Sequence, residues 1–248
     1  MNTGKKELEY VLSKLDSLGL KHMKEALQSM YNQPDFVNIG RLELISAIID
    51  EEYRADQASK YESRLKNASL KGTACSLELC VDSKERKYQP IDIVSTLASL
   101  EFIREGLNLC IFGASDSGKT YLAKAIGAEA CREFRTEYHH CENLIGDLAT
   151  IRKDDFVKYK KKIRHLRNLD LLILDDFLLH PITDDYEIKA LYDILESRNE
   201  AEKSCVICSQ RDPKSWPIML MEDEVSYNSI LKRVTKNYTV MIEKKSVD

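Results

Sequence analysis

The sequence predicts an α/β fold in which helices cover a parallel sheet of five strands, preceded by a small all-helical domain. From residue 91 onward, short apolar runs alternate with helical segments, the pattern of strands joined by helical crossovers. The first 70 residues show only helical spacing of apolar side chains. Nine glycines and five prolines in 248 residues exclude low-complexity and collagen-like chains.

Residues 1–71 are expected to form the helical N-terminal domain. Apolar side chains recur every three or four residues along its first helix: Leu8, Val11, Leu12, Leu15 and Leu18. Gly19 can end that helix, a second is expected near 20–30, and a third covers about 41–66 after Pro34. Its last turns carry Arg64 and Lys66, which are candidate DNA contacts or simply part of a solvated face.

Residues 72–90 are polar and contain Gly72 and Pro90, and we interpret them as a linker. Residues 91–248 form the α/β domain. Its candidate strands are residues 107–113, 136–141, 170–176, 203–210 and 238–243. Helical segments are expected between them, near 119–134, 142–167, 184–201 and 226–236.

A phosphate-binding loop follows the first of these strands. Residues 113–120 read GASDSGKT and match the P-loop pattern G-x-x-x-x-G-K-[ST], between an apolar strand and a helix. Backbone N–H groups of such a loop surround phosphate oxygens, the lysine reaches the β- and γ-phosphates, and the Thr120 hydroxyl ligates Mg²⁺. The alternative is a glycine-rich turn without a ligand. The predicted nucleotide-binding residues are Gly113, Ala114, Ser115, Asp116, Ser117, Gly118, Lys119, Thr120 and Tyr121.

Acidic residues supply the rest of the predicted site. Asp116 lies inside the phosphate loop, where it would repel phosphates, so we expect it to point outward. Asp175 and Asp176 follow the apolar run 171–174 at the carboxyl end of a strand, the edge where parallel sheets bind ligands. Asp175 is predicted to hold Mg²⁺ through water, and Asp176 to act as general base. A solvent-facing loop acid is the alternative for Asp176.

Two further polar residues are candidates for catalysis. Gln210 ends the strand predicted at 203–210, where its amide can contact the γ-phosphate or water, although a simple loop amide is equally compatible. Arg233 lies on an amphipathic segment before the last strand, and its simpler interpretation is a surface salt bridge.

The charge distribution singles out one basic segment. The whole chain has 37 basic and 41 acidic residues, which excludes a uniformly basic nucleic-acid-binding protein. Residues 152–167 nevertheless contain eight basic and two acidic residues on a helical pattern. Such a face neutralises phosphates without reading sequence, whereas a solvated helix normally mixes both signs. The candidate DNA contacts here are Arg152, Lys153, Lys158, Lys160, Lys161, Lys162 and Arg164.

The cysteines and chain ends indicate a cytoplasmic protein. Seven cysteines without an apolar signal segment favour reduced thiols. Cys205-x-x-Cys208 could be half of a metal site, but it lies in an apolar strand without a second pair, so core packing is the favoured interpretation. No apolar stretch is long enough to cross a membrane.

Several segments, in this order, resemble the IstB-like ATP-binding proteins, the helper ATPases of insertion-sequence transposition. They are IDIVSTLASLEFI (91–103), the P-loop segment 113–132, LDLLILDDF (169–177), SCVICSQ (204–210) followed by Lys214-Ser215-Trp216, and SILKRV (229–234). The resemblance spans nearly the whole chain. These proteins are close to the DnaC-type helicase loaders and the bacterial initiator clade of AAA+ ATPases.

The resemblance implies an AAA+ ATPase of short form, without a C-terminal lid, that uses ATP and Mg²⁺. It places Lys119 and Thr120 in Walker A and Asp175 and Asp176 in Walker B, with Thr120 and Asp175 as metal ligands. It also implies that Gln210 acts as sensor I and that Arg233 enters a neighbouring subunit's site as an arginine finger. Three departures from the family pattern concern the hydrolysis rate more than nucleotide binding: Asp116, Asp176 and Gln210.

The basic segment falls where this clade inserts a helical motif that faces DNA. The resemblance therefore implies ATP-dependent, head-to-tail assembly on DNA, through mostly backbone contacts, with a transposase as partner and no membrane. Two alternatives share the same motifs, a DnaC-like replicative helicase loader and a nucleotide-regulated DNA-binding module without significant turnover. A small-molecule P-loop kinase would need an arginine-rich lid or insert, which the sequence does not show.

Overall fold

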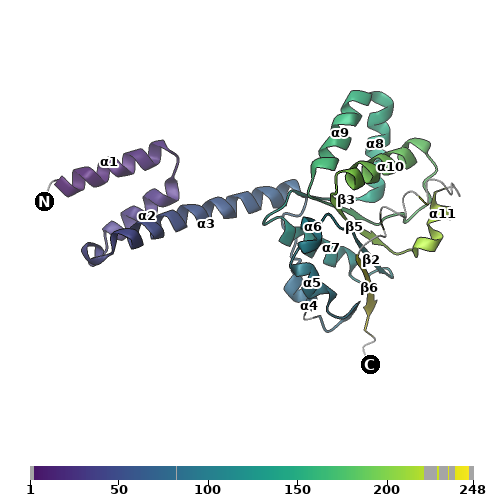
Figure 1. The fold of residues 1–248 in the computed structure, drawn as a ribbon, viewed down its shortest axis with the longest axis horizontal. Coiled ribbons are helices and arrows are strands. Elements are labelled where there is room, and N and C mark those ends of the chain that lie inside the picture. Colours follow the sequence, from purple (N-terminus) through teal and green to yellow (C-terminus); the bar gives the residue numbers. More distant parts are fainter. Residues whose placement is uncertain (1–2, 82, 221–227, 229–233, 235–237, 246–248) are drawn as a thin grey trace. The chain divides into compact units, whose positions relative to one another are not determined.

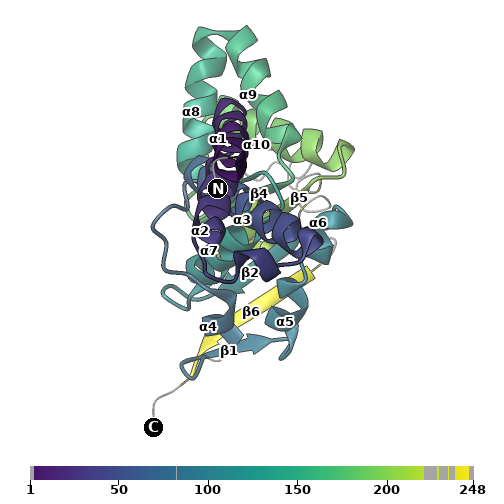
Figure 2. The same cartoon turned by 90° about the vertical axis from the view of Figure 1, so that its left-hand side faces the viewer.

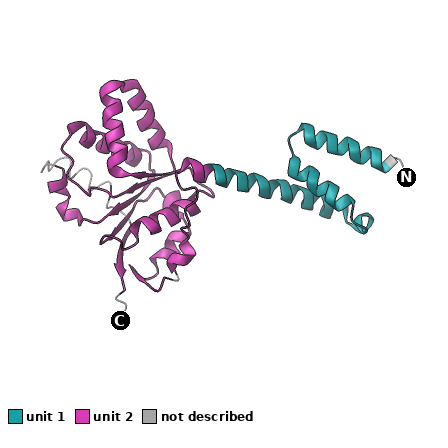
Figure 3. Cartoon of the chain, turned by 180° about the vertical axis from the view of Figure 1, so that it is seen from behind, with its two compact units in different colours: residues 1–63 teal, residues 64–248 magenta. Residues whose placement is uncertain are grey.

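The computed structural model describes residues 3–81, 83–220, 228, 234 and 238–245. The chain divides into two compact units, Met1–Ser63 and Arg64–Asp248 (Figure 3). The division falls inside a long helix and not in the predicted 72–90 segment. Each unit is therefore described by itself.

Unit 1 is helical, in the predicted order. Its elements are α1 (Thr3–Ser17), α2 (Lys21–Tyr31), the 3-10 turn η1 (Phe36–Asn38) and most of α3 (Arg41–Asn67). Gly19 separates the first two helices with a φ of +76°, a left-handed conformation that glycine adopts without strain. Helices α1 and α2 pack together, and the Met23 backbone N–H donates to Glu52 Oε2 of α3 at 2.9 Å.

The core of unit 2 is a six-stranded sheet in the order β1-β6-β2-β5-β4-β3 (Figure 1). Strands β6, β2, β5, β4 and β3 are parallel, as predicted. Strands β4 and β5 are buried along their whole length, because helices cover both faces of the sheet. The strands are β1 (Arg86–Gln89), β2 (Leu109–Gly113), β3 (Thr136–His140), β4 (Leu171–Asp175), β5 (Ser204–Ser209) and β6 (Tyr238–Lys244).

The sixth strand corrects the interpretation of residues 72–90 as a linker. This segment contains α4 (Leu77–Val81) and β1, which pairs antiparallel with β6 and occupies the edge of the sheet. Only Tyr88 of β1 is buried, so the strand lacks the apolar alternation that would have revealed it. The segment therefore belongs to the α/β unit, because its backbone completes the hydrogen bonding of β6.

Helices cover the two faces of the sheet from different parts of the chain. The face that carries Leu172 and Leu174 packs against the group α8, α9 and α10, whereas Gly127 of α7 lies against Ile173 on the other face. Figures 1 and 2 show α8, α9 and α10 gathered together. The helices are α5 (Ile93–Ala98), α6 (Glu101–Arg104), α7 (Lys119–Ala130), α8 (Cys141–Asp154), α9 (Phe156–Asn168), α10 (Asp185–Glu200) and α11 (Trp216–Met219), the last preceded by the turn η2 (Pro213–Ser215).

One predicted helix is divided into two in the structure, and another lies almost wholly outside the described residues. The helical segment predicted at 142–167 is interrupted at Asp155, whose carboxylate caps α9 by accepting the Lys158 backbone N–H at 2.9 Å. The result is a hairpin of α8 and α9 and not one helix. The helix predicted near 226–236 lies almost entirely outside the described residues.

All seven cysteines are free thiols, and Cys205 and Cys208 are buried within β5, which confirms the core-packing interpretation. Among the described helices, none combines the length and the hydropathy that a membrane span requires.

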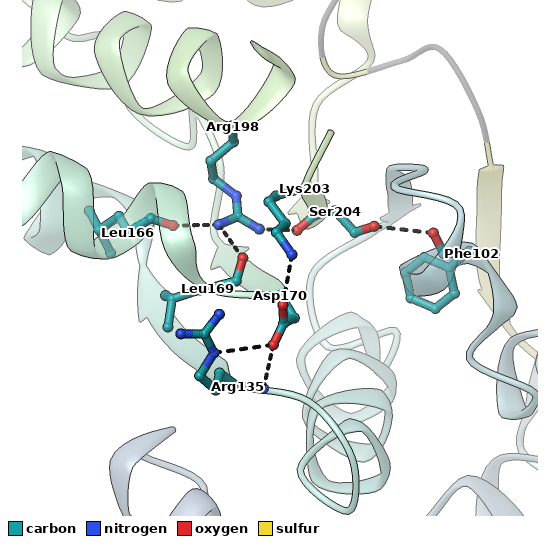
Figure 4. A network of polar contacts seen from close by, with 8 residues as sticks. All are labelled: Phe102, Arg135, Leu166, Leu169, Asp170, Arg198, Lys203 and Ser204. Atoms are coloured by element: carbon teal, nitrogen blue, oxygen red, sulfur yellow. Dashed lines mark hydrogen bonds and ion pairs between the residues drawn. The ribbon is translucent and has the colours of Figure 1, made fainter. Parts of the chain in front are cut away.

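A buried arginine joins α9, α10 and β5 (Figure 4). Arg198 of α10 is completely buried, and its guanidinium donates to the carbonyl oxygens of Leu166, Leu169 and Ser204. Its Nε donates to Cys205 Sγ at 3.2 Å. The carbonyls satisfy the cation, so it fastens the carboxyl end of α9 to the neighbouring helix and strand.

The same network continues to the start of β4 (Figure 4). Asp170 accepts from Lys203 Nζ at 2.8 Å and from the Arg135 backbone N–H at 3.1 Å. On the other side, Ser204 Oγ donates to the Phe102 carbonyl of α6 at 3.1 Å. The starts of β3, β4 and β5 are thereby held in register at the edge opposite the phosphate loop.

We expect Arg198→Met to lower the free energy of unfolding by roughly 2–5 kcal/mol, because buried carbonyls lose a charged donor. Urea denaturation monitored by circular dichroism measures this. Arg104→Met is the matched control, since Arg104 forms exposed ion pairs with Glu101 and Glu133 and its loss should lower the stability far less. Equal effects of the two substitutions would contradict the structural role given to Arg198.

Candidate nucleotide-binding site

The parallel strands bring four residues to the carboxyl edge of the sheet: three that the sequence predicted for the nucleotide site, and one further polar residue. Gly113 ends β2, His140 ends β3, Asp175 ends β4, and Gln210 follows β5. His140 and Asp175 are register partners across the β3–β4 pair. The carboxyl edge therefore collects Gly113, Asp175 and Gln210, which the sequence singled out for nucleotide chemistry, together with His140, which it did not.

The phosphate loop connects β2 to α7, and its backbone leaves room only for glycine at both ends. A Cβ on Gly113 would lie 2.5 Å from the Ile242 carbonyl oxygen and from Ser117 Oγ. Gly118 has a φ of +104° and precedes the first residue of α7. The loop thus ends at the N-terminus of a 12-residue helix, where free N–H groups and the helix dipole favour an anion.

Lys119 is folded into this loop. It is only 5% exposed, and its Nζ donates to the carbonyl oxygens of Gly113 at 3.0 Å and Ala114 at 2.8 Å. Burial lowers the pKa of its ammonium, and the nearby groups Cys208, Asp176 and Asp175 oppose that shift. The loop carbonyls therefore hold the ammonium inside the loop.

Asp175 is completely buried at the end of β4 and is held by neighbours on β3 and β4. The Tyr138 hydroxyl donates to Asp175 Oδ2 at 2.7 Å, and the Asp176 backbone N–H donates to Oδ1 at 3.0 Å. Burial and the Asp175 carboxylate raise the pKa of Tyr138, so its hydroxyl keeps its proton and remains a donor. Asp176 follows with a φ of +53°, and its Oδ2 lies 3.6 Å from His140 Nδ1.

These residues fit a magnesium ion. One ligand atom from each of His140, Asp175 and Asp176 lies within 4.8 Å of the others. Thr120 and Asp176 both line the cavity beside the phosphate loop. Carboxylate and hydroxyl oxygens are the donors that Mg²⁺ prefers, so Asp175 and Thr120 are suited to hold it, with Asp176 close by.

The cavity beside the loop has a volume of about 510 Å³. Eight of the predicted residues line it: Ser115, Asp116, Gly118, Lys119, Thr120, Tyr121, Asp176 and Gln210, the last directly after β5. Four residues that the sequence analysis did not single out complete its wall: Thr73, Cys75, Arg86 and Lys124. A cavity of this size lies within the range of small-molecule sites.

Asp116 points out of the loop, as expected. Its side chain is 86% exposed and forms an ion pair with Lys244 Nζ at the end of β6. That hydrogen bond and the charges of Lys244 and Arg86 lower the pKa of the Asp116 carboxyl. Its φ of +59° is a conformation that aspartate tolerates better than most residues.

The structure divides the predicted DNA contacts into two groups. Arg152 pairs with Asp193, Lys153 pairs with Asp184, and Arg64 donates to the backbone carbonyls of Cys131 and Arg132. These three cations already have partners within the protein. The second group is exposed and consists of Lys66 on α3 and, on α9, of Lys158, Lys160, Lys161 and Arg164, with Lys162 partly covered.

Sequence comparison then assigns the family. The profile of the IstB-like ATP binding proteins matches residues 13–247. This chain belongs to the IstB-like family. A relative from Sinorhizobium fredii, y4pL, named as an insertion sequence ATP-binding protein, is 29% identical over 227 residues, covering 91% of this chain and 90% of the relative.

Solved structures of a helicase loader and a replication initiator share the fold of this IstB-like protein. The DnaC helicase loader superimposes with a TM-score of 0.51 at 21% identity, over 66% of this chain and 96% of the loader. The replication initiator DnaA bound to AMPPCP and single-stranded DNA superimposes with a TM-score of 0.54 at 19% identity, over 69% of this chain and 50% of DnaA. At these identities the likeness establishes the fold.

The sequence analysis missed several residues of the site, and one predicted residue lies outside the described part. Tyr138 and His140 alternate along β3 (TEYHH), so both face Asp175 and Asp176. The alternation was visible in the sequence, but the pairing of β3 with β4 was not. Arg86 lies in the segment interpreted as a linker. Arg233 falls among the residues that the structure does not describe.

We expect Tyr138→Phe to lower the free energy of unfolding by roughly 1–3 kcal/mol, because the buried Asp175 carboxyl loses a donor while the ring is kept. Chemical denaturation without nucleotide measures this directly. Tyr121→Phe is the control, since that hydroxyl makes only long contacts of 3.4 and 3.5 Å with residues 76 and 74. A Tyr138→Phe protein as stable as wild type would contradict the support assigned to this hydroxyl.

Proposed function

We propose that this IstB-like protein is a DNA-binding ATPase that binds ATP with Mg²⁺ and assists transposition by assembling on DNA in the ATP state. One observation carries the proposal. Lys119, Thr120 and Asp176, predicted as Walker residues, line one cavity of about 510 Å³ at the N-terminus of α7, and the buried Asp175 accepts the Asp176 backbone N–H directly behind it. The family match and the insertion-sequence relatives support the transposition context.

The residues of the cavity divide the work of hydrolysis. Loop N–H groups bind the phosphates, and Lys119 turns from the carbonyls of Gly113 and Ala114 to the β- and γ-phosphate oxygens. Thr120 and Asp175 hold Mg²⁺, which supplies charge neutralisation at the phosphates when bound. Asp176 accepts the proton of the attacking water, and Gln210 orients that water or the γ-phosphate.

The exposed face of α9 is the proposed DNA contact. Lys160, Lys161 and Arg164 are exposed, whereas Tyr159 and Ile163 of the same helix are buried. Within the described part of the chain these three cations form no ion pair with a carboxylate. Such a face suits phosphate contacts that carry no sequence information.

Assembly is proposed from the family pattern. Arg233 of one subunit would complete the ATP site of the next, giving a head-to-tail assembly whose α9 faces follow the DNA. A transposase is the proposed partner. The fold likeness to the DnaC helicase loader favours a second candidate, a loader of a replicative helicase, which would share every site residue. Capture with purified transposase against purified helicase separates the two.

We expect Lys119→Ala to weaken ATP binding by at least about 100-fold, because the loop loses the cation that meets the phosphates. Calorimetric titration of MgATP measures the affinity, and an electrophoretic assay measures ATP-dependent assembly on DNA. Asp176→Asn is the companion variant. It should bind MgATP nearly as wild type but lose most hydrolysis, since it keeps the shape and loses the base.

Full ATP-dependent assembly by Lys119→Ala would overturn the proposed function. A wild-type protein that binds and assembles without measurable hydrolysis would instead support the nucleotide-regulated DNA-binding module.

We expect the triple charge reversal Lys160→Glu, Lys161→Glu and Arg164→Glu to weaken binding to all DNA sequences and to reduce the salt slope by about three. Fluorescence anisotropy over a salt series measures both quantities. The matched control reverses Lys84, Lys87 and Lys214, three exposed lysines elsewhere on unit 2. Strand β1, which carries Lys87, lies at the end of this unit away from α9 (Figure 2). If both triple variants bind DNA equally, α9 is a solvated face.

A further inference from the structure

We propose that Arg86, supplied by strand β1, binds the nucleotide directly, at the part shared by ATP and ADP. This inference rests on the proposed function, since it assigns a further binding residue to the same cavity. It concerns a side chain from the segment that sequence reasoning interpreted as a linker.

The Arg86 side chain lies above the phosphate loop. A Cβ built on Gly118 would lie 2.4 Å from Arg86 Nε, so the guanidinium lies directly over the last glycine of the phosphate loop. Its carbon Cζ lies 5.1 Å from the centroid of the Tyr121 ring, in a cation–π contact. Arg86 also lines the cavity. A cation held above a phosphate loop at a helix N-terminus is placed to meet an anion.

The charges around Arg86 also favour an anionic ligand. Arg86 lies directly opposite Lys244 in the antiparallel β1–β6 register, and like charges in such a pair destabilise the sheet. Lys244 is paired with Asp116. The charge of Arg86 also helps to lower the pKa of Asp116. Within the described residues, however, no carboxylate forms an ion pair with Arg86. Strands β1 and β6 therefore bring two cations, Arg86 and Lys244, to a phosphate loop whose one carboxylate, Asp116, pairs with Lys244. The charge of Arg86 is left for a phosphate group.

The contact with Tyr121 indicates which part of the nucleotide Arg86 meets. Lys119, Asp176 and Gln210 line the cavity, and the proposed function gives these three residues to the γ-phosphate and the attacking water. The Tyr121 hydroxyl instead lies beside the wall formed by Thr73 and Cys75, 3.4 Å from the Ser76 backbone nitrogen and 3.5 Å from the Ala74 carbonyl oxygen. Arg86 stacks on Tyr121, so it contacts the nucleotide away from the γ-phosphate.

The test compares Arg86→Ala with Lys87→Ala in the full-length protein. Lys87 is the next residue of β1, is exposed, and points to the other face of the strand, so both variants lose one positive charge. Calorimetric titration gives the affinities for MgATP and MgADP. We expect Arg86→Ala to bind both about 10- to 100-fold more weakly, to a similar degree, because hydrogen bonds to a charged group are lost. Lys87→Ala should stay within about twofold of wild type.

Arg86→Lys and Arg86→Gln keep the test decisive if Arg86→Ala does not fold, as judged by circular dichroism. Arg86→Lys should recover part of the affinity and Arg86→Gln less. Wild-type affinity for both nucleotides in the Arg86 variants, with binding lost in Lys119→Ala, would overturn this inference and leave the proposed function intact. A loss confined to MgATP would overturn the placement of Arg86. Wild-type binding by Lys119→Ala as well would overturn the proposed function itself.

Discussion

The parallel register of β2, β5, β4 and β3 is the constraint on which the site depends. Parallel strands end at the same edge of a sheet, so the phosphate loop, Asp175, His140 and Gln210 meet there although they are far apart in sequence. The register is supported at the opposite edge by polar contacts, of which those of Arg198 are buried. Arg198 and Asp170 connect the starts of β3, β4 and β5 to α9 and α10.

Burial of charge is the second feature of the site. Lys119 and Asp175 are both buried, and burying an isolated charge is costly unless hydrogen bonds satisfy it. The loop carbonyls hold Lys119, while the Tyr138 hydroxyl and a backbone N–H hold Asp175. The free protein therefore keeps both buried charges satisfied by hydrogen bonds, and in the proposed ATP complex Lys119 exchanges these carbonyls for phosphate oxygens.

Strands β1 and β6, which form one side of the sheet, both contact the phosphate loop through a side chain. Lys244 reaches Asp116, an unusual carboxylate in such a loop, and Arg86 lies over Gly118. A family-based view treats Asp116 as a departure that could weaken nucleotide chemistry. In this fold its charge is directed to Lys244, which also ties the edge strand β6 to the loop.

The sequence by itself determined the elements that depend on local patterns. Apolar periodicity predicted the N-terminal helices and the five parallel strands, and the spacing of Gly113, Gly118 and Lys119 predicted the phosphate loop. Only the tertiary structure decided what depends on long-range pairing. Strand β1 exists because β6 offers it hydrogen bonds, not because its own residues alternate. Likewise, contacts across the fold occupied Arg64 and Arg152 and left Lys160 and Arg164 exposed, which no helical spacing reveals.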